Sequence, residues 1–132
     1  MRINYINKVL GYLERMEYRV LYKEESSGIL KVSKEEDGIG HLIIGVVPPI
    51  LIFESFLFDI HQDDLSMYKA LLQKNRDMIH GAFVLNNDAT KILYRYTLQI
   101  ENVDFNEFES AINALSFLLS EYATQIILFS KQ

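Results

Sequence analysis

The chain has 132 residues, 49% of them hydrophobic and 12% aromatic, which predicts one folded domain over residues 1–132 and excludes a disordered protein. Its 18 acidic residues outnumber its 13 basic ones, for a formal charge of -5, which disfavours nucleic acid and anionic membrane surfaces as partners. The absence of cysteine excludes disulfides, thiolate metal ligands and a cysteine nucleophile.

The beginning of the chain predicts a helix followed by a β-hairpin. Apolar residues recur at helical spacing over residues 3–16. The period changes to two over residues 18–23, a Ser-Ser-Gly turn follows, and the period of two resumes over residues 29–33. The first residues lack the apolar stretch and the small-residue cleavage site of a signal peptide, so we expect a cytoplasmic protein.

Two further strands are predicted at residues 41–47 and 50–58, on either side of Pro48 and Pro49. Proline has no backbone N–H to donate to a sheet, so this pair marks the connection between the strands. The apolar stretch 42–58 is shorter than the roughly 20 residues that cross a bilayer, and Glu54 interrupts it. We therefore expect buried strands and no membrane partner.

The middle of the chain predicts a second helix and a second hairpin. Asp63 or Asp64 can cap a helix that ends at Asn75. Two strands follow at residues 81–85 and 89–100, joined by an Asn-Asn-Asp turn. In the second of these strands, apolar and aromatic side chains alternate with a second set of side chains, which is the pattern of a strand.

The end of the chain predicts one long helix. Asp104 at the N-cap and Glu107 three residues later form a capping box. Apolar residues then recur every three or four positions as far as Phe129. Ala114 and Phe117 are among the residues that widen this stripe, giving the width that a helix lying on a sheet requires.

The strand at residues 50–58 is the best candidate for a binding surface, because it is apolar on both faces. If the helices cover only one face of the sheet, the other face needs a cover as well. A partner protein or a second subunit could supply it, or another part of the same chain could fold over it. The residues that we predict to bind a partner or to form a dimer are Ile50, Ile52, Glu54, Phe56 and Phe58.

A cluster of polar residues at positions 59–64 is a weaker candidate for chemistry. Asp59, His61 and Asp64 would be the residues of an enzyme, but the segment lacks the glycine and the distal glutamate of a calcium loop. Helix capping accounts for the carboxylates at positions 63 and 64. The three histidines are not at the spacing of a metal pair. We therefore expect no metal, no cofactor and no enzymatic activity.

Two arginines are candidates for a small-ligand site. Arg76 and Arg95 could meet the anionic group of a ligand held between the sheet and the final helix. The favoured interpretation of Arg95 is an ordinary outward residue on a half-exposed strand.

Three short stretches and the capped final helix carry a family resemblance. The stretches are Leu71-Leu72-Gln73-Lys74-Asn75, Gly81-Ala82-Phe83-Val84-Leu85 and Leu93-Tyr94-Arg95. Together with the order of the elements, they resemble the YbjN-like branch of the type III secretion chaperone superfamily. The resemblance implies an α+β fold with an antiparallel sheet of five to six strands and helices largely on one face. Its order is helix, three or four strands, helix, two strands, helix.

The resemblance also implies a function. Proteins of this kind commonly dimerise and bind an unfolded or extended protein segment through apolar patches, without ATP or metal. We therefore predict a non-enzymatic, chaperone-like protein-binding module that forms a homodimer and binds a client or partner through an apolar sheet face. The alternative is a small-ligand-binding or sensory domain of the same fold.

Overall fold

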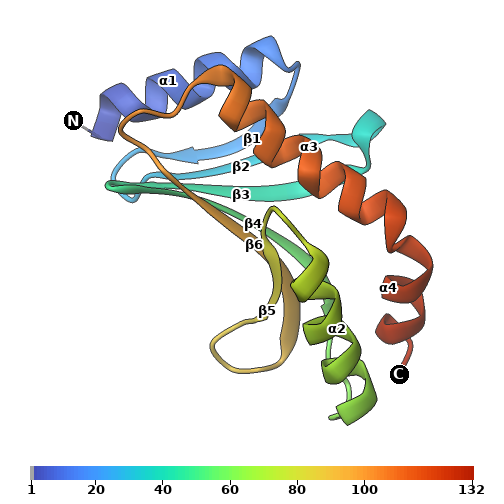
Figure 1. The fold of residues 1–132 in the computed structure, drawn as a ribbon. Helices are drawn as coiled ribbons and strands as arrows, with labels where there is room; N and C mark the ends of the chain where they lie inside the picture. The colour runs from blue at the N-terminus through green and yellow to red at the C-terminus, as the bar shows by residue number, and fades with distance from the viewer. Residues whose placement is uncertain (1) are drawn as a thin grey trace.

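The computed structural model describes residues 2–132, apart from the side chain of Ile3, and shows an antiparallel sheet with helices on one face (Figure 1). The helices are α1 (Arg2–Arg15), α2 (Leu65–Asp77), α3 (Phe105–Glu121) and α4 (Ala123–Ser130), with a short 3-10 helix η1 at Glu35–Asp37. The strands are β1 (Arg19–Glu24), β2 (Ile29–Lys34), β3 (Ile39–Val47), β4 (Ile50–Asp59), β5 (Ala82–Leu85) and β6 (Lys91–Gln99). The predicted fold class is confirmed.

The six strands lie in the order β1-β2-β3-β4-β6-β5. The first four form a meander of antiparallel neighbours, and the hairpin predicted at residues 18–33 is its first pair of strands. β6 then pairs along almost the whole length of β4, from Ile50 opposite Gln99 to Asp59 opposite Lys91. Because β6 occupies this place, the short β5 is left at the edge of the sheet.

The hydrophobic core lies between one face of the sheet and the helices. Phe108 of α3 is fully buried, and its ring centroid is 5.3 Å from that of Tyr12 in α1 and 5.5 Å from that of Phe53 in β4. The main contributors from α1, the sheet and α3 are Ile6, Val9, Leu13, Leu30, Ile44, Leu51, Ile112 and Leu115. Along each strand, successive side chains point to opposite faces of the sheet, so every second one enters this core.

The prediction of one long final helix is wrong. The helix breaks at Tyr122, whose backbone leaves the helical region, and α4 is bent by 68° from α3. The bend brings α4 back onto β4, where the ring centroids of Phe129 and Phe58 are 6.2 Å apart. The sequence around Tyr122 contains no glycine or proline, so this break has no local signal.

Phe117 also departs from its predicted place. The apolar stripe of α3 predicted that this side chain would cover the sheet, as Leu118 and Ala111 do. Instead the Phe117 side chain is 68% exposed. The stripe that packs on the sheet is therefore narrower than predicted, and a large aromatic ring is left outside the core.

Candidate functional site

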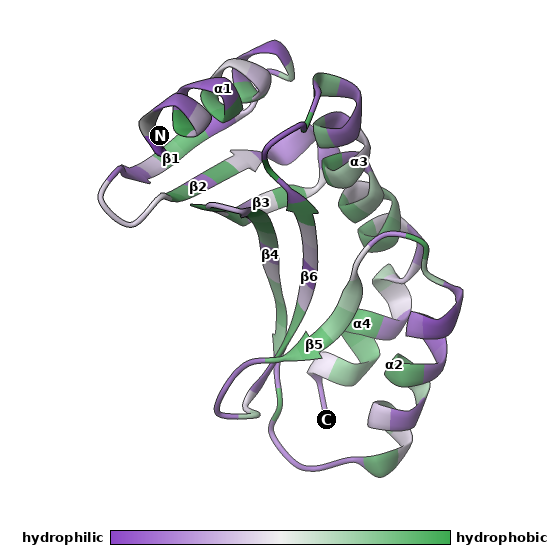
Figure 2. Ribbon diagram, turned by 60° about the vertical axis from the view of Figure 1, so that its left-hand side comes forward, coloured by the Kyte–Doolittle hydropathy of each residue, from purple (hydrophilic) through white to green (hydrophobic). Residues whose placement is uncertain are grey.

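The face of the sheet opposite the helices, called the open face below, exposes an apolar surface. Figure 2 shows this sheet with all labelled helices on its other side and hydrophobic residues dominating β4. Phe56 is 51% exposed, Ile43 38% and Val47 37%. The outward apolar side chains are Ile29, Ile43, Val47, Ile50, Ile52, Phe56, Val84 and Leu93. No element of residues 2–132 lies over them.

These side chains form rows that run across the strands. Phe56 of β4 lies opposite Leu93 of β6, which in turn lies opposite Val84 of β5. Residues in such register share a face and their side chains contact one another. The rows therefore bring apolar residues that are far apart in the sequence together on one face.

Gly45 lies in the same surface, opposite Ile29 of β2 and Ile52 of β4. It is buried, because the neighbouring side chains of Ile52 and Val47 pack around it: a Cβ at Gly45 would lie 3.5 Å from the Cβ of Ile52 and 3.7 Å from a methyl group of Val47. The aliphatic side chains therefore close over this glycine.

One ion pair interrupts the apolar surface. Glu54 of β4 stands opposite Arg95 of β6, and the Arg95 guanidinium donates to the Glu54 carboxylate. The two side chains are 28% and 39% exposed, so the pair is partly hydrated and contributes little to stability. Its charges satisfy each other, which leaves the open face without a free charge at its centre.

Charged groups also border the open face. Lys91 forms an ion pair with Asp59, and its ammonium lies 5.2 Å from the ring centroid of Phe56. Toward the β1 edge of the sheet, the ammonium of Lys31 in β2 lies 5.4 Å from the ring centroid of Tyr22 in β1. An apolar centre with a polar rim is the usual anatomy of a protein–protein interface.

Four of the five residues predicted for partner binding lie on the open face: Ile50, Ile52, Glu54 and Phe56. The prediction is wrong at Phe58. A β-bulge between Phe56 and Phe58 leaves Leu57 without a partner in β6. This extra residue reverses the alternation and turns Phe58 inward, where it is 3% exposed and contacts Phe129.

The carboxylates of the polar cluster at positions 59–64 are engaged in local contacts. Asp59 pairs with Lys91, and Asp63 accepts a hydrogen bond from the hydroxyl of Tyr68. Asp64 caps α2 by accepting from the backbone N–H groups of residues 66 and 67. His61 is exposed, and none of these residues lines either of the two hollows next to α3 that are described below. Within residues 2–132 there is no group of three His, Asp or Glu side chains placed to hold a metal.

The two arginines proposed for ligand binding are not brought together. Arg95 points into the open face and is paired with Glu54, away from the final helix. Arg76 is exposed on α2, which packs on the helical side of the sheet. Arg95 is therefore an outward residue on a half-exposed strand, which was the favoured prediction from the sequence.

The residues that carried the family resemblance build the connection from α2 to β5. The side chain of Asn75 accepts from the backbone N–H of Phe83 at 2.8 Å and donates to its carbonyl at 3.0 Å. It thereby occupies hydrogen-bonding groups at the free edge of β5, which would otherwise be available to another strand.

Gly81 fits this connection for two reasons. Its φ of +77° favours glycine, and a Cβ there would lie 2.4 Å from the ring of Tyr94. The hydroxyl of Tyr94 donates to the carbonyl of His80 at 3.1 Å. Burial, with a smaller contribution from Tyr96, raises the pKa of Tyr94 to about 12. The hydroxyl therefore remains a donor at neutral pH.

The members of the open face that β2, β3, β5 and β6 contribute were not predicted from the sequence: Ile29, Ile43, Val47, Val84 and Leu93. Alternation within each strand indicates which residues share a face. It does not indicate which strands are neighbours, so the rows could be assembled only from the strand order.

No single helix of residues 2–132 is long and apolar enough to cross a membrane. α3 and α4 reach the required length and composition only when they are taken together, and the 68° bend separates them.

Comparisons with known proteins agree with this fold. The family model CesT_Tir_1 matches residues 2–132. The crystal structure of YbjN from E. coli, a candidate transcription regulator, superposes with a TM-score of 0.66 at 12% identity, covering 91% of this chain and 92% of that one. The HopA1-SchA chaperone–effector complex contains a chain with a TM-score of 0.63 at 9% identity, covering 98% of this chain and 96% of that one. No curated protein matches the sequence.

Proposed function

The chain belongs to the CesT_Tir_1 family, a type III chaperone family, and on this premise we propose that it is a non-enzymatic protein-binding module whose open face binds another protein. The observation that carries the proposal is the set of exposed apolar side chains that β2 to β6 place on the open face around the Glu54–Arg95 ion pair. Water-exposed apolar surface of this extent is uncommon on a monomer and marks interaction sites.

The partner of the open face is a client protein or a second copy of the chain. The similarity to a chain of the HopA1-SchA chaperone–effector complex supports a protein partner. Burying one large apolar side chain such as Phe56 contributes roughly 1.5–3 kcal/mol, so a few of the eight apolar residues could anchor a partner. The proposal includes a homodimeric, cytoplasmic protein that acts as one domain without ATP or metal.

A role in binding DNA has less physical support. YbjN is described as a candidate transcription regulator, but this chain has a formal charge of -5. The centre of the open face carries one paired arginine and no row of cations. Binding to phosphates depends on Lys and Arg side chains that release counterions, and this surface does not supply them.

Light scattering over a range of micromolar concentrations tests the dimer. We expect wild-type protein to have the mass of a dimer and the Phe56→Asp variant to shift to a monomer, because the substitution places a charge in the buried interface. The matched control is Leu72→Asp, since Leu72 is 67% exposed on α2, away from the open face. An unchanged mass for Phe56→Asp would remove the open face from the dimer interface.

Site-specific photo-crosslinking tests the client. A benzophenone amino acid at position 56 should form crosslinks in cells to another protein, identified by mass spectrometry, while the same probe at position 72 should not. In the light-scattering experiment, a monomeric mass for the wild-type protein would contradict the homodimer. Equal crosslinking from both positions, or none from position 56, would contradict the open face as the binding surface.

A further inference from the structure

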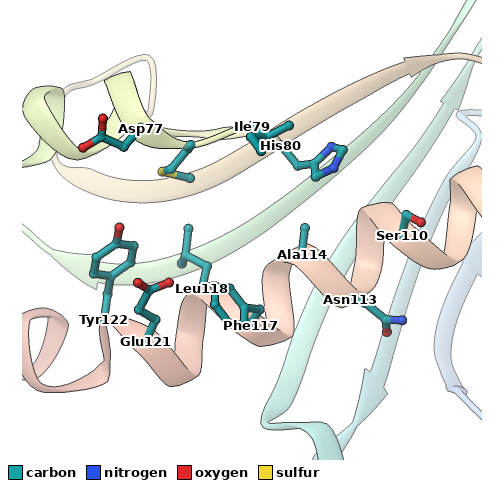
Figure 3. Close-up of a pocket in the computed structure, with 11 residues that line it drawn as sticks. Asp77, Ile79, His80, Ser110, Asn113, Ala114, Phe117, Leu118, Glu121 and Tyr122 are labelled. Atoms are coloured by element: carbon teal, nitrogen blue, oxygen red, sulfur yellow. The ribbon is translucent and has the colours of Figure 1, made fainter.

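A second surface lies on the helical side of the sheet, between α3 and the segment at residues 77–80. It contains a hollow of about 660 Å³, which Figure 3 shows with the side chains of α3 on one side and those of the 77–80 segment on the other. A smaller hollow of about 320 Å³ adjoins it, because both are lined by His80 and Ser110. We call the two hollows together the α3 groove.

The α3 groove extends along most of α3. Its lining residues on and next to α3 run from Asn106 to Tyr122, which corresponds to roughly 24 Å along the axis of a helix. That length equals roughly seven residues of extended chain. A small molecule would fill only part of it, whereas an elongated peptide segment matches its length.

Two large apolar side chains stand on opposite sides of the groove (Figure 3). Ile79 is 88% exposed and Phe117 is 68% exposed. Neither contributes to the core, and Phe117 is the residue that the apolar stripe of α3 predicted to be covered. An apolar side chain inserted between them would remove both from water.

The wall opposite α3 is held in place before any partner arrives. Nδ1 of His80 lies 3.1 Å from the hydroxyl of Tyr96, within hydrogen-bond distance, and the carbonyl of His80 accepts from Tyr94. Asn75 anchors the next strand through Phe83. A preformed wall lowers the entropy that binding must overcome.

The charges along the groove have one sign. Asp77 and Glu121 line one end and Glu107 lines the other, and no Lys or Arg lines either hollow. Lys74 does not line the groove, but its ammonium lies near this end, 5.4 Å from the ring centroid of Tyr122. Burial raises the pKa of Tyr122, and the negative charges of Glu121 and Asp77 raise it further. The negative charges of Glu121 and Asp77 therefore both reach the Tyr122 ring at this end of the groove.

We propose that the α3 groove binds an elongated segment of a partner protein, with apolar side chains at its centre and Lys or Arg at its ends. The apolar centre packs between Ile79 and Phe117. One basic end meets Asp77 and Glu121, and the other meets Glu107. The groove faces away from the open face, so this proposal does not depend on what the open face binds.

Selection from a display library of random peptides of about 12 residues, which exceeds the length of the groove, tests the proposal with the intact protein as bait. We expect selected peptides to carry bulky apolar residues flanked by Lys or Arg. Fluorescence anisotropy then measures the affinity of one selected peptide. Phe117→Ser and Ile79→Ser should each weaken binding at least about tenfold, as the loss of an apolar anchor does.

The charge variants and the control make the test specific. The double variant Asp77→Asn, Glu121→Gln should weaken binding about two- to fivefold and reduce its dependence on salt. The control Phe56→Ser, on the open face, should leave the affinity unchanged. The proposal is wrong if no peptide is enriched, if the enriched peptides lack basic residues, or if Phe117→Ser binds as wild-type protein does. Loss of binding in Phe56→Ser alone would assign the peptides to the open face.

Discussion

The two faces of the sheet carry similar side chains and differ in what lies over them. On the covered face, Leu30 and Ile44 are completely buried beneath the helices and Phe53 is 1% exposed. On the open face of the same strands, Ile43 and Phe56 are 38% and 51% exposed. An apolar side chain on a strand thus indicates that burial is favourable, but the element packed over it decides whether burial occurs within the chain.

Because of this difference, the covered face contributes mainly to folding stability, and the open face is available for binding. The covered face removes its apolar area from water when the chain folds, so its side chains stabilise the monomer. The open face keeps much of its apolar area in water, so the same kind of side chain contributes less to folding and can contribute to association. Substitutions on the two faces should therefore have different effects.

The largest effect is expected for a truncation on the covered side. Phe108→Ala should lower the free energy of unfolding by about 3–5 kcal/mol, because it leaves a cavity between Tyr12 and Phe53. The matched variant Phe56→Ala, on the open face, should lower it by less than about 1 kcal/mol when the protein is monomeric. Urea denaturation of both variants measures this, and equal losses would break the distinction between the faces.

A smaller loss is expected at the glycine beneath Tyr94. Gly81→Ala should cost about 2–4 kcal/mol, because the new Cβ meets the Tyr94 ring and the backbone has a positive φ. Gly38→Ala is the control, since Gly38 has φ of +79° but nothing within 4 Å of an added Cβ. It should cost only about 1 kcal/mol. Thermal unfolding of the two variants separates the steric contribution from the backbone contribution.

Alkaline pH should lower the free energy of unfolding through Tyr94, which is buried on the covered face. The pKa of Tyr94 rises from 10.0 to about 12 on burial, so the folded state holds this proton more tightly than the unfolded chain. Stability should be unaffected by this group below about pH 10 and should fall, on the order of 1–2 kcal/mol, as the pH rises to about 12. In Tyr94→Phe the fall should be shallower. Urea midpoints that are equal at pH 9 and pH 11.5 in wild-type protein would contradict this.

The smallest effect is expected for the ion pair on the open face. Glu54→Gln should change the free energy of unfolding by less than about 1 kcal/mol, because the Glu54–Arg95 pair is partly hydrated. In the dimer, however, the same variant leaves the Arg95 charge without a partner in the interface, and association should weaken. Urea unfolding of the monomer measures the effect on folding, and the dissociation constant of the dimer measures the effect on association. A loss of several kcal/mol in the monomer would show that the pair stabilises the fold itself.

Much of the fold was predictable, because its signals are local. Asp64 caps α2 as proposed, and Asp104 and Glu107 form the predicted capping box of α3. The alternation in β6 correctly separated its covered residues from its outward ones. The candidate site was predictable in part: alternation placed Ile50 to Phe56 correctly, and it failed at Phe58 because a bulge depends on the pairing with β6.

The sequence by itself determined the type and order of the elements and the apolar character of both faces of β4. Periodicity, caps and turn residues act over a few positions along the chain, and they carry that information. Only the tertiary structure decided that α4 bends back at Tyr122, that Arg95 pairs with Glu54 and that Phe117 stands outside the core opposite Ile79. These outcomes depend on packing and pairing between residues distant in the sequence, which no local pattern encodes.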